Sequence, residues 1–286
     1  MGDDEFEFGS AKPMLPADQI ASLISNAFST CDRAHPERLL LFHCYLTALP
    51  PIPRHIIPRV VELDVRRNYM TSLDLSSAGA ESDATESQSA SVPVAPQFTF
   101  EWTKLAKLSL GANDLTEMPV LSAAPNLREL VMNHNRLKAI TNLEHVPNLE
   151  LLDLRSNKLE VVSGLLAVPR LQRLCLSCNH IARIDYESVP PLCDLQFFSL
   201  FGNYIPTLAE ILPLLRPMAK LQKLLIGGNP FLTSAAEVPP PEIAREVLEI
   251  VPTLQWLNWA HVPSYFAALN AQSTFIHTES TAMATN

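Results

Sequence analysis

The sequence has few glycines, and they form no phosphate-binding loop. Glycine accounts for only 8 of 286 residues, and the pair Gly227-Gly228 directly precedes Asn229 at the end of an expected strand. Loops that cradle phosphates need several glycines at fixed spacing before a helix. The 8 histidines are dispersed, and no spacing groups one of them with a nucleophile. We therefore expect a protein that is not an enzyme and that has no catalytic residues and no cofactor.

Basic charge, an even set of cysteines and long apolar runs are also missing. The formal net charge is −9, and nucleic-acid affinity rests largely on Lys and Arg, so we expect no direct nucleic-acid partner. The 5 cysteines are an odd number, which fits a reducing compartment. No stretch approaches the ~18 consecutive apolar residues of a membrane span, and the acidic N-terminal residues are unlike a secretory signal. These absences predict an intracellular protein with no membrane partner. We also expect a monomer.

Cys175 and Cys178 have the C-x-x-C spacing found in many metal sites. A structural zinc ion needs four ligands, and the sequence lacks a second pair at such spacing. Both cysteines also fall on an expected strand and the bend that follows it. We interpret them as small side chains that fill strand positions, and we predict no metal ligands.

The sequence is instead rich in one repeated motif, Leu-x-x-Leu-x-Leu-x-x-Asn-x-Leu, which is clearest from Leu149 to Leu159. The asparagines of successive motifs are 22 residues apart from Asn113 to Asn179. A fixed period of 20–29 residues with this motif is the signature of leucine-rich repeats. The chain therefore resembles leucine-rich repeat proteins, and its short period resembles their 22-residue, SDS-type class.

The physical chemistry of the motif predicts a strand that ends at the asparagine. Leu152 and Leu154 alternate with Asp153 and Arg155, as in a strand with one buried and one wet face. The resemblance implies that Asn157 binds backbone groups of neighbouring turns and forms a ladder through the stack, a role that suits an amide because it donates and accepts. One such unit cannot bury its apolar edge alone, so stability comes from its neighbours.

Alignment on the asparagine predicts about eight units, the first of which has Cys44 in place of the amide. The expected fold is α/β, a curved leucine-rich repeat solenoid with parallel strands on the concave face, helical or irregular return limbs and a cap at each end. The structural ladder is expected to comprise Asn68, Asn113, Asn135, Asn157, Asn179, Asn203 and Asn229.

Composition and periodicity divide the chain into segments. Apolar residues at helical spacing follow Ala17 and predict an N-terminal capping helix, because a solenoid needs its first apolar edge covered. A stretch rich in Ser, Ala, Glu, Thr and Pro interrupts the second unit. The expected segments are a disordered tail at 1–15, the capping helix at 16–34, the repeat domain at 35–262 with a disordered insertion at 76–97 and a C-terminal cap at 240–262, and a flexible tail at 263–286.

An apolar cluster is expected on the concave face near its C-terminal end. Phe197, Phe201 and Leu225 fall at solvent-facing strand positions, with Tyr204 beside them. Exposed apolar patches commonly mark an interface, so we predict that these residues bind a partner. The alternative is that a return limb or the segment 263–286 covers them.

A charged row is expected in the middle of the same face. Asp153, Arg155 and Arg173 can form ion pairs across neighbouring strands, and Val131 and Leu151 lie among them. We predict that these five residues also contact the partner. A solvated row of charges that contributes little energy is the alternative interpretation.

The resemblance also implies a function, which is binding a protein partner on the concave face as a non-catalytic scaffold. It extends to regulatory subunits of protein phosphatase 1, the axonemal dynein leucine-rich light chain and the spliceosomal A-prime protein. These proteins usually have Tyr-Arg and Leu-Asp around the C-terminal cap helix, where this chain has Ile243 and Asn258. The implied locations are the cytoplasm, the flagellum or cilium and the nucleus.

Overall fold

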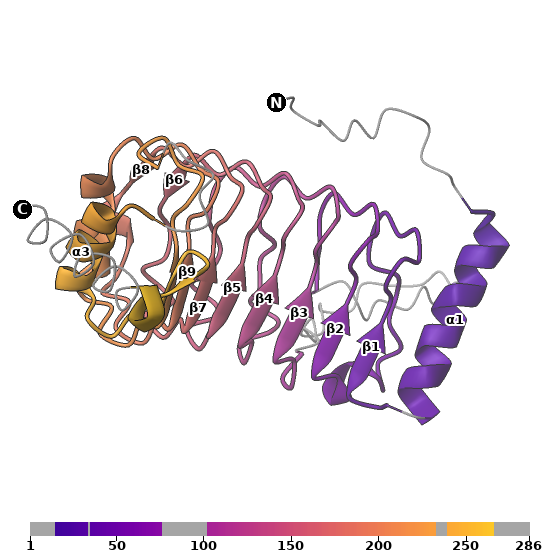
Figure 1. Ribbon diagram of the computed structural model, residues 1–286. Coiled ribbons are helices and arrows are strands. Elements are labelled where there is room, and N and C mark those ends of the chain that lie inside the picture. The colour runs from indigo at the N-terminus through magenta and orange to yellow at the C-terminus, as the bar shows by residue number, and fades with distance from the viewer. Residues whose placement is uncertain (1–14, 34, 76–101, 233–238, 266–286) are drawn as a thin grey trace, which may run out of the picture.

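The chain winds into stacked coils that lie between two helices (Figure 1). The computed structural model describes residues 15–33, 35–75, 102–232 and 239–265. The expectations for 1–14, 76–97 and 266–286 therefore lie outside the described residues. One strand of each coil joins a 10-stranded sheet. These strands are β1 Arg38–Leu40, β2 Glu62–Asp64, β3 Lys107–Ser109, β4 Glu129–Val131, β5 Leu151–Asp153, β7 Arg173–Cys175, β9 Phe197–Ser199, β10 Lys223–Leu225, β11 Trp256–Leu257 and β12 Ala260–His261.

The strands from β1 to β11 pair in parallel, and equivalent residues of neighbouring coils lie side by side. Leu130 pairs with Leu152, Leu152 with Leu174 and Leu174 with Phe198. The central residue of each three-residue strand in this sheet is fully buried, because alternate side chains point to opposite faces of a strand. The predicted solenoid with parallel strands is confirmed.

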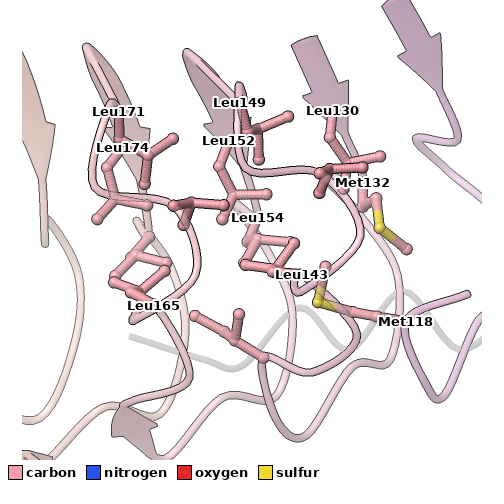
Figure 2. Packing of buried hydrophobic residues seen from close by; sticks show 14 of the residues in the cluster. Met118, Leu130, Met132, Leu143, Leu149, Leu152, Leu154, Leu165, Leu171 and Leu174 are labelled. Carbon is pink, nitrogen blue, oxygen red and sulfur yellow. The ribbon is translucent and has the colours of Figure 1, made fainter. Parts of the chain in front are cut away.

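The return limbs are mostly irregular, and they are short in the middle of the array because the coils from Asn113 to Asn179 span only 22 residues each. Their apolar side chains fill the interior behind the sheet. Their regular elements are η1 Ile57–Arg59, β6 Val161–Val162, β8 Arg183–Ile184, η2 Tyr186–Ser188, η3 Leu208–Glu210 and α2 Leu212–Leu215. Figure 2 shows how leucines of neighbouring coils stack on one another, among them Leu143, Leu149, Leu152, Leu154, Leu165, Leu171 and Leu174.

The ladder asparagines bind the backbone of two coils at once. Oδ1 of Asn157 accepts a hydrogen bond from the Leu137 N–H at 3.0 Å. Its Nδ2 donates to the carbonyl of Met132 in the preceding coil at 3.0 Å and to that of Leu154 in its own coil at 2.9 Å. Equivalent bonds are made by Asn68, Asn113, Asn135, Asn179, Asn203 and Asn229.

Cys44 holds the ladder position of the first coil, where no earlier coil exists within the sheet order. An amide there would lack a preceding carbonyl and N–H to bind, so a small buried thiol suffices. Oδ1 of Asn68 accepts from the Cys44 N–H at 3.0 Å and ties the first coil to the second.

A left-handed bend precedes each ladder position. Ser156, directly before Asn157, has φ 54°, and this bend ends the strand and turns the amide inward. Only the last two of these bends use glycine, which adopts positive φ most readily. The residues with this conformation are His43, Arg67, Ala112, His134, Ser156, Cys178, Gly202 and Gly228.

A helix covers each end of the stack. The helix α1 Ala17–Arg33 lies beside β1 and buries Cys31, while Ile24 and Phe28 are partly buried against the same core. At the other end, α3 Pro241–Ile250 buries Ala244 and Val247. Residues 262–265 form a helical turn, and the Tyr265 hydroxyl donates to the Pro239 carbonyl at 2.9 Å. Among the described residues, no helix combines the length and apolar character needed to cross a membrane.

Candidate interaction face

The outer side of the 10-stranded sheet, which we call the strand face, carries two rows of strand side chains. The rows follow from strand register, because residues that pair between parallel strands point the same way. The first row comprises Arg38, Glu62, Lys107, Glu129, Leu151, Arg173, Phe197, Lys223 and Trp256. The second row lies two residues further along each strand and includes Leu40, Asp64, Val131, Asp153 and Leu225.

Cations of the first row at the N-terminal end face carboxylates across strands. Arg38 Nε lies 2.7 Å from a Glu62 carboxylate oxygen. Lys107 Nζ lies 3.6 Å from carboxylate oxygens of both Glu62 and Glu129. These pairs are partly exposed, so each contributes on the order of 0–1 kcal/mol to stability. Their charges are nevertheless compensated within the chain.

Two further cations pair within their own coil. The guanidinium of Arg66 binds both carboxylate oxygens of Asp64, at 2.6 Å through its NH2 group, and Arg155 binds Asp153 in the same way at 2.7 Å. These hydrogen bonds to the aspartates raise the pKa of both arginines. The predicted ion pairs across neighbouring strands are therefore not found among these three residues. Asp153 and Arg155 pair with each other within one coil, and Arg173 does not join them. Val131 and Leu151 are half-buried beside them.

The C-terminal end of the strand face is aromatic. Arg173 stacks over the Phe197 ring at 5.7 Å, and Phe201 meets Trp259 edge to face at 6.4 Å. Lys223 Nζ lies 5.8 Å from the Trp256 ring and 5.5 Å from the Trp259 ring. We call these residues the aromatic patch; its members are Arg173, Phe197, Phe201, Lys223, Trp256 and Trp259. Within the described chain, neither Arg173 nor Lys223 has a carboxylate partner.

The prediction that Leu225 faces solvent is wrong, because only 7% of it is exposed. The hairpin of β11 and β12 adds a strand beside β10, so Leu225 lies inside the sheet and not at its edge. Phe197 and Phe201 are half-buried. Tyr204 is 58% exposed and lies beside His180, with ring centroids 5.7 Å apart.

Asn258 positions the hairpin that carries the two tryptophans. Its φ of 51° places it in the left-handed region at the turn. Its Oδ1 accepts from the N–H groups of Ile226 at 2.8 Å and Gly227 at 2.9 Å, and its own N–H donates to the Leu224 carbonyl at 2.8 Å. Asn258 thus satisfies backbone donors that the end of a parallel sheet leaves unpaired. The amide Nδ2 finds no partner within the described part of the chain.

Sequence spacing did not single out Trp256 and Trp259 as candidate contact residues. They are 40% and 52% exposed. Trp256 could have been found by extending the first row one strand beyond Lys223, because Leu254 and Leu257 repeat the leucine spacing. Trp259 had no such signal, since its place depends on the chain reversal at Asn258.

The cysteines differ in accessibility, which yields a test of the described coils. Cys178 and Cys193 are exposed, Cys31 and Cys44 are buried and Cys175 is half-buried. Burial raises the pKa of the Cys44 and Cys175 thiols, so they carry less reactive thiolate at a given pH. We expect iodoacetamide at about pH 8 to label Cys178 and Cys193 first, and the other three after unfolding, as read by mass spectrometry. Rapid labelling of Cys175 in the folded protein would contradict this arrangement.

Among the described residues, no three His, Cys, Asp or Glu side chains are grouped as metal ligands would be. Cys175 and Cys178 follow the predicted positions on and after a strand, and the Cys175 thiol contacts the Ser177 hydroxyl at 3.4 Å. The C-x-x-C spacing is thus part of the repeat geometry.

Comparison with known proteins shows the fold. No protein-family model and no curated protein matches the chain. Among solved structures, the TLR13–ssRNA13 complex matches with a TM-score of 0.56 and 22% identity, over 81% of this chain and 34% of that chain. A leucine-rich repeat protein of Leptospira interrogans matches with a TM-score of 0.49 and 21% identity, over 73% of this chain and 52% of that one. The Drosophila melanogaster SNF/U2A′ complex matches with a TM-score of 0.40 and 28% identity, over 47% and 74%.

Proposed function

We propose that this leucine-rich repeat solenoid is a non-catalytic scaffold that binds a partner protein on its concave strand face, with the aromatic patch as the main contact. The observation that carries the proposal is the exposure of Trp256 and Trp259 on the outer side of a hydrogen-bonded sheet, at 40% and 52%. Tryptophan, tyrosine and arginine are the residues most enriched at the energetic centres of interfaces. Tyr204, which is 58% exposed beside His180, is proposed as a further contact.

The strand face supports tight binding because it is preorganised. Strand pairing fixes the backbone of β9, β10 and β11, and stacking holds the Arg173 and Lys223 side chains over aromatic rings. Association then loses less side-chain entropy than it would on a loop. The central residues Asp153, Arg155, Val131 and Leu151 lie on the same face and are proposed to make the outlying contacts.

The aromatic patch can be tested by charge substitution. Trp259→Asp and Phe201→Asp are each expected to weaken partner binding about 30-fold or more, the loss typical of an interface hot spot of about 2 kcal/mol. The partner is first enriched from cell extract on the wild-type protein and identified, and its affinity is then measured by calorimetric titration. Val120→Asp serves as the control, because Val120 is 56% exposed on the limb between β3 and β4. Unchanged affinity for the two patch variants would exclude the patch as the binding site.

The same enrichment distinguishes the three partner classes that the sequence resemblance supports. The scaffold would recover a phosphatase-1 catalytic subunit, an axonemal or microtubule component, or a spliceosomal protein. Imaging of a tagged copy assigns it to the cytoplasm, the cilium or the nucleus.

A further inference from the structure

We infer that the aromatic patch recognises an acidic helical segment of the partner, in which two carboxylates flank an apolar side chain. This inference rests on the proposed scaffold function and specifies its ligand. The carboxylates would meet Arg173 and Lys223, and the apolar side chain would meet Phe197 between them.

The inference starts from an asymmetry of charge along the strand face. Arg38, Arg66, Lys107 and Arg155 each have a carboxylate within 4.0 Å supplied by this chain. Arg173 and Lys223 have none within the described ranges, and their cations lie against aromatic rings instead. A cation over a ring remains able to bind an anion on its other side, because the ring quadrupole neutralises no net charge. The complementary ligand is therefore anionic.

The spacing of the two cations favours a helix over a strand. Arg173, Phe197 and Lys223 are consecutive in the first row, and adjacent strands lie about 4.8 Å apart, so the two cations are about 10 Å apart at the backbone. Residues i and i+7 of a helix lie on one face and are about 10.5 Å apart. Residues on one face of an extended chain are about 7 or 13 Å apart. A helix that crosses the strands thus places acids at i and i+7, with an apolar residue at i+3 or i+4 over Phe197.

The aromatic rings define what lies next to the acids. Trp256 follows Lys223 in the first row, and Trp259 and Phe201 lie beside it. Lys223 is half-buried beside these rings, and a carboxylate contact is stronger there than at a fully exposed pair.

The probe for this inference is a stapled, alanine-based helical peptide of about 16 residues, long enough to hold a helix. It carries Glu at i and i+7 and Leu at i+3 and i+4. Binding to the full chain is followed by calorimetry and by the fluorescence of Trp256 and Trp259. We expect saturable binding, at least tenfold weaker for the same peptide with Lys in place of Glu. The double variant Arg173→Glu/Lys223→Glu is expected to reverse this preference, which loss of structure cannot do.

Neutralising controls separate the patch from general electrostatics. Arg173→Gln and Lys223→Gln are each expected to weaken binding of the Glu peptide about three- to tenfold. Lys107→Gln removes a first-row cation that is already paired with Glu62 and Glu129, and it should change affinity less than about twofold. Equal binding of the Glu and Lys peptides overturns the inference. Tighter binding of oligouridylate than of the Glu peptide also overturns it. The same holds if the free protein self-associates and the double variant abolishes this, or if tryptophan emission shows that both patch tryptophans are already buried.

Failure of this inference can be told apart from failure of the scaffold proposal. If the Glu peptide does not bind but Trp259→Asp still releases the enriched partner, the patch binds a ligand of other chemistry. If Trp259→Asp leaves the partner bound, the site itself lies elsewhere.

Discussion

Replacing Asn157 with alanine is expected to lower the free energy of unfolding by about 3–5 kcal/mol. The substitution leaves the buried Leu137 N–H without a partner. The carbonyls of Met132 and Leu154 each lose one of two amide donors, because Asn135 and Asn179 still bind them. The unsatisfied N–H costs about 1–3 kcal/mol, and each of the two lost hydrogen bonds to a carbonyl costs about 0.5–1.5 kcal/mol more. Because coils interact only with their neighbours, the loss should also broaden the transition as the two halves of the array uncouple.

Cys44→Ala is the matched control for the ladder. Cys44 occupies the same position of the motif, but its thiol makes only a weak contact with the Phe42 carbonyl at 3.6 Å. Its removal is expected to cost about 1 kcal/mol. Urea unfolding followed by circular dichroism gives both values. Equal losses for the two variants would show that the ladder bonds add nothing beyond buried volume.

Trp102→Ala is expected to lower the free energy of unfolding by about 3–5 kcal/mol through the cavity it leaves. Trp102 is 0% exposed, and its indole N–H donates to the Leu75 carbonyl at 3.2 Å. It lies eleven residues before the ladder residue Asn113, a position held by Ala124, Val146 and Val168 in the next three coils. The smaller side chains at this position in the other coils show that the repeat itself does not require a tryptophan, so the cavity left by Trp102→Ala is specific to this coil.

Trp259→Ala provides the contrast within one residue type. Trp259 is 52% exposed, so its loss should change stability by less than about 1 kcal/mol while it reduces partner binding. Urea unfolding of both variants is compared at the same protein concentration. A larger loss of stability for Trp259→Ala than for Trp102→Ala would contradict the burial of the two side chains.

The repeat architecture was predictable because a single physical constraint is stated many times. Each coil needs leucines at the positions of Leu149, Leu152 and Leu154 to fill a shared core, and an amide at Asn157 to bind two coils. The repetition averages out local exceptions such as Cys44. Register alone then gives the rows of the strand face, including the places of Arg173 and Phe197.

The C-terminal end was less predictable because it departs from the repeat. The leucine spacing around Leu254 and Leu257 predicts a further strand but not its reversal at Asn258. That reversal places Trp259 beside Phe201 on the strand face. The pairing of Arg155 with Asp153 on its own coil depends on side-chain conformation, which sequence spacing does not determine. For the same reason, sequence spacing does not show that Arg173 lacks a carboxylate partner among the described residues.

The side chain of each ladder asparagine forms hydrogen bonds with its own coil and with the coil before it. Every junction between coils in the middle of the array is therefore chemically alike. Whole 22-residue coils could be added between Asn135 and Asn157, each extending the molecule by about 4.8 Å, with both terminal helices and the tryptophan hairpin unaltered. The length of the array and the surface at its C-terminal end can therefore be varied separately, and the chain could be engineered as a spacer of adjustable length with a fixed binding end.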